Sequence, residues 1–251
     1  MTVESASVCV VEHGNSSARQ EEISRFLTEQ NVKISTTANY RLHCYDEHLL
    51  LEDCKHPDQL TIQVDFSAGK MQWRRNQSER LHRALGINDH RKPNIIDATA
   101  GLGHDAFVMA HQGSAITLLE NNPIVFLLLQ DGIKQAQDAG EAAANNMNAI
   151  FTDANDYLST LSQAPEVIYL DPMFPSNKKS AKTKKEMQVL QTLVGKSDDD
   201  QALLELARDT AINRVVAKRP IKAASYAEST PDFSISGKNI RYDVYSKRKF
   251  T

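Results

Sequence analysis

The chain has 251 residues, of which 41% are hydrophobic and 24% are charged, and its formal net charge is −3. This is an ordinary globular composition, and the length corresponds to between one and two domains of about 150 residues. It excludes a disordered tail, a coiled coil and a mini-protein that needs disulfides or metals to fold. The longest unbroken apolar run, residues 124–129, is far shorter than the roughly 20 residues of a membrane-spanning helix.

The cysteines and the N-terminal segment indicate where the protein works. Cys9, Cys44 and Cys54 are odd in number and form no C-x-x-C pair, which favours a reducing cytoplasm over a disulfide framework or a zinc site. We expect three buried or half-buried thiols. The N-terminal segment has no basic start and only a short apolar stretch, so we expect no secretory signal.

Residues 1–90 are predicted to form a small N-terminal α+β region. The patterns indicate helices at 20–30 and 78–85, strands at 49–51 and 60–66, and a turn at 67–70 before a short strand through residue 73. Gly86 is a natural stop for the second helix. The His-Arg-Lys-Pro run at 90–93 marks a boundary, because a proline disfavours helix just before it.

Residues 91–251 are predicted to form an α/β domain. Strands at 95–96, 116–119, 149–151, 167–170 and 215–217 alternate with helices at 105–111, 123–139, 155–161, 182–194 and 199–212. This alternation implies a mainly parallel sheet covered by helices on both faces. Strands at 233–235 and 241–245 flank the turn sequence Ser-Gly-Lys-Asn and complete seven strands with an antiparallel hairpin. Many methyltransferases that use S-adenosylmethionine have a similar plan.

A glycine turn follows the first strand of this domain. Gly101 and Gly103 allow a tight turn and a close approach of a ligand to bare backbone, just before a helix N-terminus. Glu120 ends the next strand, where a carboxylate can accept both hydroxyls of a ribose. The same stretch fits the G-x-G-x-x-G/A dinucleotide pattern, so an NAD(P)-dependent oxidoreductase remains an alternative.

Several polar residues around this turn favour a sulfonium cofactor. Asp97 resembles the acidic residue that opens the turn in methyltransferases, where it organises the loop near the methionine amino group. Residues 101–170 carry a net charge of −7, which suits a cationic ligand better than a pyrophosphate. Asp153 stands where this fold commonly holds the adenine amine, or it caps the following helix. His104 and Asp105 lie where the loop meets its helix, and Asp105 could be a helix N-cap.

A second motif ends the fourth strand. The buried-strand pattern at 167–170 runs into Asp171-Pro172-Met173-Phe174-Pro175, at the sheet edge where open α/β folds bind ligands. The amine of guanine or adenine is a poor nucleophile and must be held in line with the methyl group. The Asp171 carboxylate and the Pro172 carbonyl can each accept one N–H, and Phe174 can stack on the base. The alternative is an ordinary Asp-Pro turn.

The sequence resembles the RsmJ-type family, bacterial methyltransferases that act on a guanine N2 of 16S ribosomal RNA. The resemblance covers about residues 60–250 and rests on five segments: D-A-T-A-G-L-G-H-D-A-F-V-M-A (97–110), L-L-E-N-N-P (118–123), Y-L-D-P-M-F-P (169–175), K-K-S-A-K-T-K-K-E-M-Q-V-L-Q-T-L-V-G (178–195) and R-V-V-A-K-R-P (214–220). It implies a class I methyltransferase fold, S-adenosylmethionine as donor and RNA of the small subunit as substrate. By matching positions, it implies that the cofactor residues are His104, Asp105, Glu120, Asn121, Asp153, Ala154 and Asp171.

The basic end of the chain is the candidate RNA-binding region. Residues 171–251 carry a net charge of +6, which suits a polyanion, although such runs are commonly solvated surface lysines. The residues expected to hold phosphates around an unstacked base are Lys178, Lys179, Lys182, Lys184, Lys185, Lys218 and Arg219. Two further alternatives stay open, an adenine-N6 methyltransferase and a non-catalytic RNA-binding assembly factor.

Overall fold

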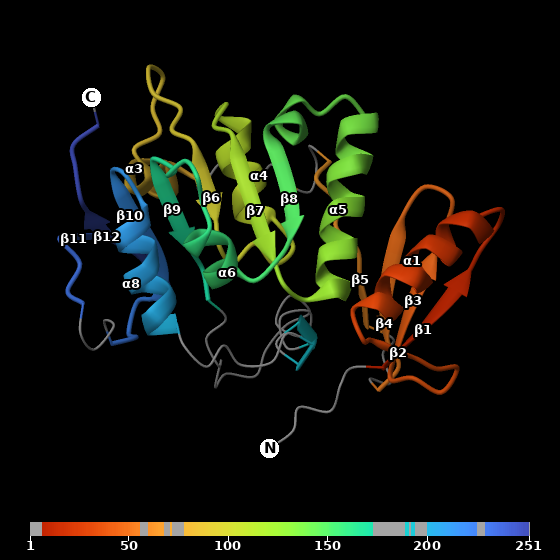
Figure 1. Cartoon of the computed structure of the whole chain (residues 1–251). Helices are drawn as coiled ribbons and strands as arrows, with labels where there is room; N and C mark the ends of the chain where they lie inside the picture. Colours follow the sequence, from red (N-terminus) through yellow and green to blue (C-terminus); the bar gives the residue numbers. More distant parts are fainter. Residues whose placement is uncertain are drawn as a thin grey trace.

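The computed structural model describes residues 7–55, 60–67, 71, 78–172, 189–190, 192–193, 200–224 and 229–250. They form two β-sheets that lie side by side (Figure 1), one of seven strands and one of five. The strands of the larger sheet are β6 (Ile95–Asp97), β7 (Ile116–Glu120), β8 (Met147–Phe151), β9 (Val167–Leu170), β10 (Arg214–Pro220), β11 (Phe233–Ser236) and β12 (Ile240–Ser246). The helices are α1 (Ser17–Glu29), α3 (Glu79–Leu85), α4 (His104–His111), α5 (Pro123–Asp138), α6 (Ala154–Ser159) and α8 (Asp200–Thr210), with a 3₁₀ turn η1 (Ala142–Asn146).

The seven-stranded sheet confirms the predicted doubly wound architecture. Its strand order is β11-β12-β10-β9-β6-β7-β8. The pairs from β10 to β8 are parallel, whereas β12 pairs antiparallel with both β10 and β11. The chain runs from β6 outward to β8, then returns to β9 on the other side of β6. The strand order therefore reverses between β6 and β9, which is where such sheets bind their ligands.

Alternate residues of the central strands enter two separate cores. In β9, Val167 and Tyr169 join a core covered by α3, α4 and α5, whereas Ile168 and Leu170 join a core covered by α6 and α8. This follows from the period of two in a strand. All four residues of β9 are buried, as expected for a parallel strand with helices on both faces.

The smaller sheet has the order β2-β1-β3-β4-β5. Its strands are β1 (Ser7–Glu12), β2 (Lys33–Ile34), β3 (Tyr40–Cys44), β4 (Leu49–Asp53) and β5 (Leu60–Ile62). β1, β2 and β3 were not predicted from the sequence, and the strand predicted for 60–66 ends at Ile62. The predicted turn at 67–70 and strand through residue 73 lie mostly outside the described residues, as does most of the helix predicted for 182–194.

The remaining predicted elements lie within a few residues of the observed ones. α3 ends at Gly86 as expected, and α5 begins with a proline in its first turn and is capped by the Asn122 side chain. Of the cysteines, Cys44 is buried and Cys9 half-buried, but Cys54 is exposed, so the expectation for that thiol is wrong. No helix among the described residues combines the length and apolar character needed to cross a membrane.

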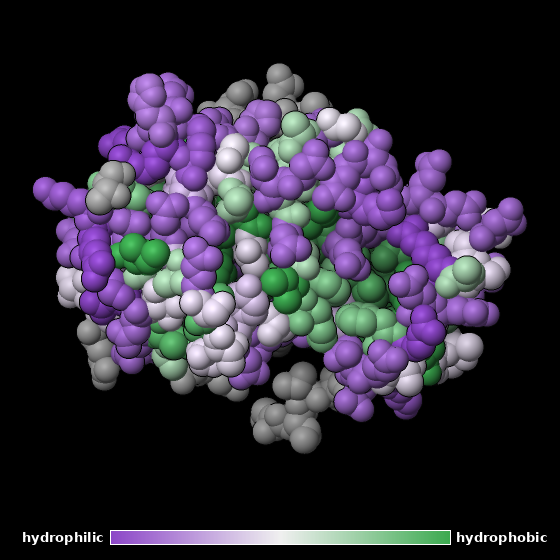
Figure 2. All heavy atoms as spheres, turned by 45° about the horizontal axis from the view of Figure 1, so that its top comes forward, coloured by the Kyte–Doolittle hydropathy of each residue, from purple (hydrophilic) through white to green (hydrophobic). Residues whose placement is uncertain are grey.

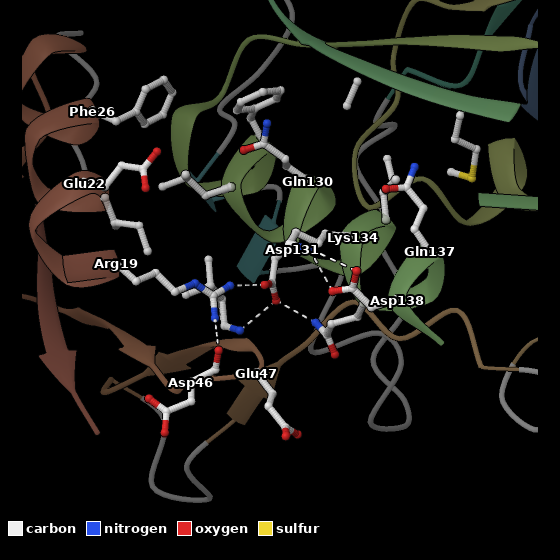
Figure 3. A pocket seen from close by; sticks show the side chains of 18 of the residues that line it. Arg19, Glu22, Phe26, Asp46, Glu47, Gln130, Asp131, Lys134, Gln137 and Asp138 are labelled. Carbon is white, nitrogen blue, oxygen red and sulfur yellow. Dashed lines mark hydrogen bonds and ion pairs between the residues drawn. The ribbon is translucent and has the colours of Figure 1, made fainter. Parts of the chain in front are cut away.

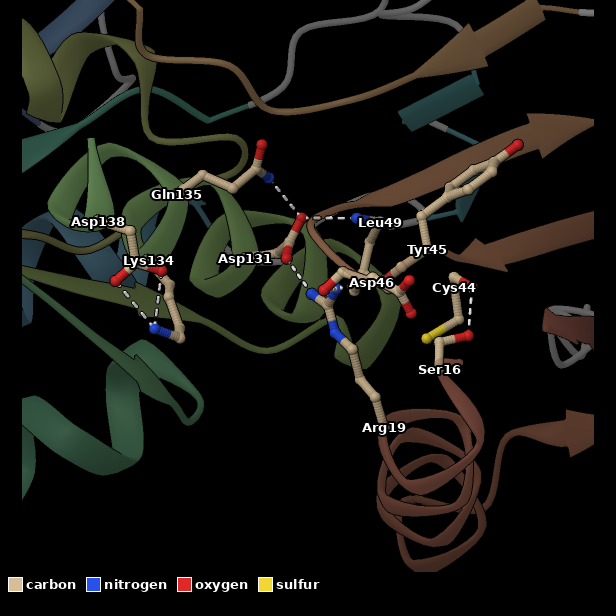
Figure 4. A network of polar contacts seen from close by, with 10 residues as sticks. All are labelled: Ser16, Arg19, Cys44, Tyr45, Asp46, Leu49, Asp131, Lys134, Gln135 and Asp138. Atoms are coloured by element: carbon tan, nitrogen blue, oxygen red, sulfur yellow. Dashed lines mark hydrogen bonds and ion pairs between the residues drawn. The ribbon is translucent and has the colours of Figure 1, made fainter. Parts of the chain in front are cut away.

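The smaller sheet is joined to the larger one through α5 (Figure 4). The Asp131 side chain, 5% exposed, forms an ion pair with Arg19 of α1 and accepts hydrogen bonds from the Leu49 backbone N–H (2.7 Å) and the Gln135 side chain (2.7 Å). Beside it, the rings of Phe26, Phe126 and Phe151 contact one another, with centroids 5.3–5.9 Å apart. Polar and aromatic contacts thus fix α1 against α5.

A groove of about 1060 Å³ lies at this junction, lined by residues of α1, α5, the loop before β4 and the start of β8. Figure 3 shows Glu22 and Phe26 of α1 facing Gln130 and Lys134 of α5 across it. In Figure 2, apolar residues lie at the bottom of the hollow beside the smaller sheet and hydrophilic ones on its rim. The groove contains none of the residues that the sequence analysis selected as site residues.

Candidate active site

The glycine turn and the Asp-Pro motif meet at the ends of β6 and β9. The Ala98 N–H donates to the Tyr169 carbonyl (3.0 Å), and the Asp171 N–H donates to Thr99 Oγ1 (2.6 Å). Asp171 therefore lies beside the turn that follows β6, at the reversal of strand order. Pro172 is buried, whereas Phe174 lies outside the described residues.

Both glycines of the turn have backbone conformations that favour glycine. Gly101 has φ +53° and Gly103 has φ +71°, a region that L-residues with a side chain rarely adopt. A Cβ atom at Gly103 would lie 2.5 Å from Leu129 Cδ1, so this position also requires close packing against α5. A Cβ atom at Gly101 would have no other atom within 4 Å. The backbone of Gly101 thus borders open space.

Glu120 supports the turn from the end of β7. Its Oε2 atom accepts the Gly101 N–H (3.0 Å), and its Oε1 atom accepts the Asn122 N–H (2.7 Å). Burial raises the pKa of this carboxyl to about 7, although the backbone N–H groups favour its charged form. The predicted ribose-binding carboxylate is therefore fixed next to the open space over Gly101.

Asp97 is the most enclosed carboxyl of the site, with 2% of the residue exposed. It accepts the Thr99 N–H at 3.2 Å, in the turn itself. Burial raises its pKa to about 8, and the nearby carboxylates of Asp105 and Asp171 add to the rise. Asp97 is consistent with the loop-organising role predicted for it.

Lys218 connects the two motifs. Its Nζ atom lies 2.7 Å from Asp105 Oδ2 and 2.8 Å from Asp171 Oδ2, and its side chain is 20% exposed. Burial alone would lower the pKa of Lys218, but Asp105 and Asp171 outweigh burial and raise the pKa above its usual value. The sequence pattern groups this lysine with the predicted phosphate-binding residues, whereas in the structure it lies between two carboxylates.

Asp105 is not the cap of α4, contrary to one expectation. The N-cap is Gly103, and no side chain caps the helix. Asp105 instead accepts a hydrogen bond from the Tyr169 hydroxyl (2.7 Å) as well as the contact from Lys218. His104 begins the helix and lies edge-on to the ring of Phe66.

The other predicted cofactor residues lie at the ends of β7 and β8. Asn121 Nδ2 donates to Asp153 Oδ2 (3.2 Å), which brings these two side chains together. Asp153 also caps α6 by accepting the Asn155 N–H (2.8 Å), and Ala154 begins that helix. The predicted capping role of Asp153 is confirmed.

The predicted RNA-binding residues are not all described. Arg219 is buried and donates through Nη2 to the Ala224 carbonyl, so it points to a different environment from Lys218. Those outside the described residues are Lys178, Lys179, Lys182, Lys184 and Lys185.

Sequence reasoning missed Thr99, Tyr169 and Tyr242. Thr99 accepts the Asp171 N–H, and the Tyr169 hydroxyl donates to Asp105. Tyr242 pairs with Lys218 across β12 and β10. A tyrosine within the apolar strand Val-Ile-Tyr-Leu was the one available signal, because a buried hydroxyl requires a polar partner.

The fold and this edge define a Rossmann-like S-adenosylmethionine-dependent methyltransferase. Residues 25–247 match the family described as putative SAM-dependent methyltransferases, and the chain belongs to this family. Curated relatives include "Ribosomal RNA small subunit methyltransferase J" of Thioalkalivibrio sulfidiphilus, 45% identical over 73% of this chain and 75% of that protein. The protein of the same name from Coxiella burnetii is 39% identical over 91% of this chain and 93% of its own length.

A solved structure agrees with this assignment. The crystal structure of an SAM-dependent methyltransferase from Neisseria gonorrhoeae has a TM-score of 0.73, 29% sequence identity and coverage of 96% of both chains. The cofactor is therefore S-adenosylmethionine, and the oxidoreductase alternative falls away.

The residues of the site fit this cofactor. Gly101 leaves open space at the turn, Glu120, the predicted ribose-binding carboxylate, is fixed beside it, and the carboxylates of Asp105 and Asp171 suit a ligand with a sulfonium and an ammonium group. When bound, S-adenosylmethionine supplies an electrophilic methyl group. No group of three His, Cys, Asp or Glu side chains with metal-binding geometry occurs in the described part of the chain.

Proposed function

We propose that the protein transfers a methyl group from S-adenosylmethionine to the exocyclic N2 of a guanine in 16S ribosomal RNA of the small subunit. The observation that carries the proposal is the position of Asp171, hydrogen-bonded through its N–H to Thr99 of the cofactor turn. The names of the relatives, which share 39–45% identity with the chain, support small-subunit RNA as the substrate. We propose that this reaction takes place in the cytoplasm.

Asp171 and Pro172 can orient the planar amine of guanine for the reaction. The nitrogen lone pair of guanine is delocalised into the ring, so the amine must be oriented before it reacts. The Asp171 carboxylate accepts one N–H and the Pro172 carbonyl accepts the other, which directs the lone pair towards the methyl group. The nitrogen gains the bond to carbon as the carbon–sulfur bond breaks, and one amine proton leaves towards an acceptor such as Asp171.

Phe174 and the basic residues complete the proposal. A ring after the Asp-Pro pair stacks on the face of an unstacked base, a contact worth about 1–3 kcal/mol. The lysines at 178–185 hold backbone phosphates and contribute position rather than sequence specificity.

The test is to identify the methylated nucleoside. Purified protein is incubated with S-adenosylmethionine and unmodified small subunits or 16S RNA, and the RNA is digested and analysed by mass spectrometry. The proposal expects N2-methylguanosine at one position. Detection of N6-methyladenosine would show that the acceptor is adenine. RNA retention without methyl transfer would indicate a non-catalytic assembly factor.

A further inference from the structure

The active-site edge contains more acid than base among its described side chains. Asp97, Asp105 and Asp171 lie near one another, and Lys218 forms ion pairs with Asp105 and Asp171. The three carboxylates come from β6, α4 and the residue after β9, while the lysine comes from β10. One ammonium therefore joins parts of the site that are distant in the sequence.

The two contacts of Lys218 link the donor side of the site to the acceptor side. Asp105 lies in the first turn of α4, the helix that follows the glycine turn, and Asp171 opens the motif proposed to hold the amine. The Tyr169 hydroxyl donates to the same Asp105 oxygen that receives Lys218, so this end of the bridge is itself fixed. A carboxylate held by a fixed ammonium has a defined orientation.

We propose that Lys218 is a positioning residue, whose ammonium orients the Asp171 carboxylate and keeps it ionised for the acceptor amine, and that Lys218 does not hold an RNA phosphate. The inference rests on the proposed function, because it assigns Asp171 to the amine. It departs from the expectation that Lys218 is one of the residues that hold RNA phosphates. Lys218 acts through Asp171 and is not itself a catalytic residue.

The surroundings of Lys218 keep it charged. Among the described residues, the titratable groups that face it are Asp97 on β6, Asp105 on α4, Tyr169 and Asp171 on and after β9, and Tyr242 on β12. Burial raises the pKa of both Tyr169 and Tyr242, and the neighbouring carboxylates add to the rise, so both phenols stay neutral. Charge balance at this edge therefore depends on the lysine and the carboxylates.

The competing roles predict different kinetics. If Lys218 held a phosphate, its removal would raise the KM for RNA and weaken the salt dependence of RNA binding, with kcat unchanged. If Lys218 had only a structural role, its removal would reduce the fraction of folded protein but leave the kinetics of the folded enzyme unchanged. If Lys218 positions Asp171, its removal would lower kcat and move the acidic limb of the pH–rate profile. The limb moves because removing a cation makes protonation of a nearby carboxylate easier.

The experiment compares Lys218→Met, Lys218→Arg and the control Lys134→Met. Lys134 lies on α5 in an exposed ion pair with Asp138, so its removal deletes a lysine remote from the site. Methyl transfer to 16S RNA is measured from pH 5 to 9 at saturating S-adenosylmethionine over a range of RNA concentrations, and rates are expressed per folded molecule from melting curves.

For Lys218→Met, the proposal expects kcat to fall about 100-fold with little change in the KM for RNA. The acidic limb should move up by about one pH unit. Lys218→Arg should recover at least about tenfold of the lost rate but stay below wild type, because its planar fork cannot reproduce both contacts. Lys134→Met should match wild type.

Two results would overturn the inference. One is an unchanged kcat with a raised KM for RNA and a shallower salt dependence in Lys218→Met. The other is a loss of rate fully explained by unfolded protein, with the pH profile unmoved. If Lys218→Met does not fold, Lys218→Arg decides: wild-type kcat and KM would overturn the inference, because arginine binds phosphate as well as lysine does.

The wild-type product keeps this test separate from that of the proposed function. If wild-type protein makes N2-methylguanosine and the Lys218 variants behave like wild type, only the positioning role fails. If wild-type protein methylates another atom, the guanine proposal fails, and the comparison of Lys218 variants is read on that product.

Discussion

The protein contains two networks of charged side chains that differ in their balance of charge. At the junction of the two sheets, one carboxylate, Asp131, is met by one guanidinium, Arg19, and by two further donors. At the active-site edge, one ammonium, Lys218, is shared by Asp105 and Asp171, with Asp97 buried beside them. Among the described residues, the junction pairs one acid with one base, whereas the site holds more carboxyl groups than ammonium groups, which suits a cationic ligand. Perturbed groups in such an excess are typical of functional sites.

The junction network should therefore matter for stability and not for chemistry. Asp131→Asn removes the buried negative charge that pairs with Arg19, and removing one partner of such a pair destabilises the fold. We expect the free energy of unfolding to fall by about 3 kcal/mol, measured by urea denaturation. The rate of methyl transfer per folded molecule should stay at the wild-type value. A large loss of that rate would remove the distinction between the two networks.

Close packing of α5 provides a second test of the junction. A Cβ atom at Gly132 would lie 2.2 Å from Val64 Cγ1, so the helix and the segment after β5 require a glycine here. Gly132→Ala should lower the free energy of unfolding by about 2 kcal/mol, despite the higher helix propensity of alanine.

The double variant of Gly132→Ala with Val64→Ala checks this cause. It should be more stable than the sum of the two single changes predicts, because the smaller side chain removes the overlap. Additive effects would show that the contact with Val64 is not the reason why Gly132→Ala destabilises the protein.

The excess acid of the site should appear in the pH dependence of stability. The pKa of Asp97 is raised to about 8 in the folded protein, so the folded state binds a proton that the unfolded state has lost. The contribution of Asp97 to the free energy of unfolding is fully present below the pKa of an unfolded aspartate. It is lost as the pH rises to about 8. Glu120, raised to about 7, acts in the same direction.

The variant Asp97→Asn should therefore flatten the fall of unfolding free energy between about pH 5 and 8. Each group contributes at most about 1.4 kcal/mol per pH unit. Asp89→Asn, a change at an exposed carboxylate, is the control and should keep the wild-type slope. A wild-type slope in Asp97→Asn would show that the buried Asp97 carboxyl is not the source of the fall in unfolding free energy with pH.

The smallest effect is expected at the exposed end of α5. Asp138 pairs with Lys134 one turn away, and both side chains are mostly exposed. Asp138→Asn makes the same chemical change as Asp131→Asn on the same helix, but we expect a loss below about 0.5 kcal/mol. A loss as large as that of Asp131→Asn would show that burial does not separate the two positions.

The sequence predicts the larger sheet well because its signals are local. Apolar runs stop at Asp97, Glu120 and Asp171, where β6, β7 and β9 end, and Pro123 marks the start of α5. The strands of the smaller sheet were harder to detect. β2 has only two residues, both exposed, and β3 alternates buried residues with Arg41 and His43 on its other face.

The direction in which a charged residue points could not be predicted from composition. Lys218 and Arg219 are consecutive in a basic segment, but adjacent residues of a strand point to opposite faces. Lys218 reaches the carboxylates of the site, whereas Arg219 bonds the Ala224 carbonyl. The partners of Lys218 lie 47 and 113 positions away in the chain, so only the folded arrangement identifies them.

The most direct test of the account is single-turnover methyl transfer by Asp171→Ala on 16S RNA, with the affinity for S-adenosylhomocysteine and the retention of RNA measured on the same preparation. The account predicts a fall in rate of at least about 100-fold while RNA retention stays close to wild type. Full-rate formation of N2-methylguanosine by this variant would contradict it, because the donor turn and the acceptor amine would then not meet at the ends of β6 and β9.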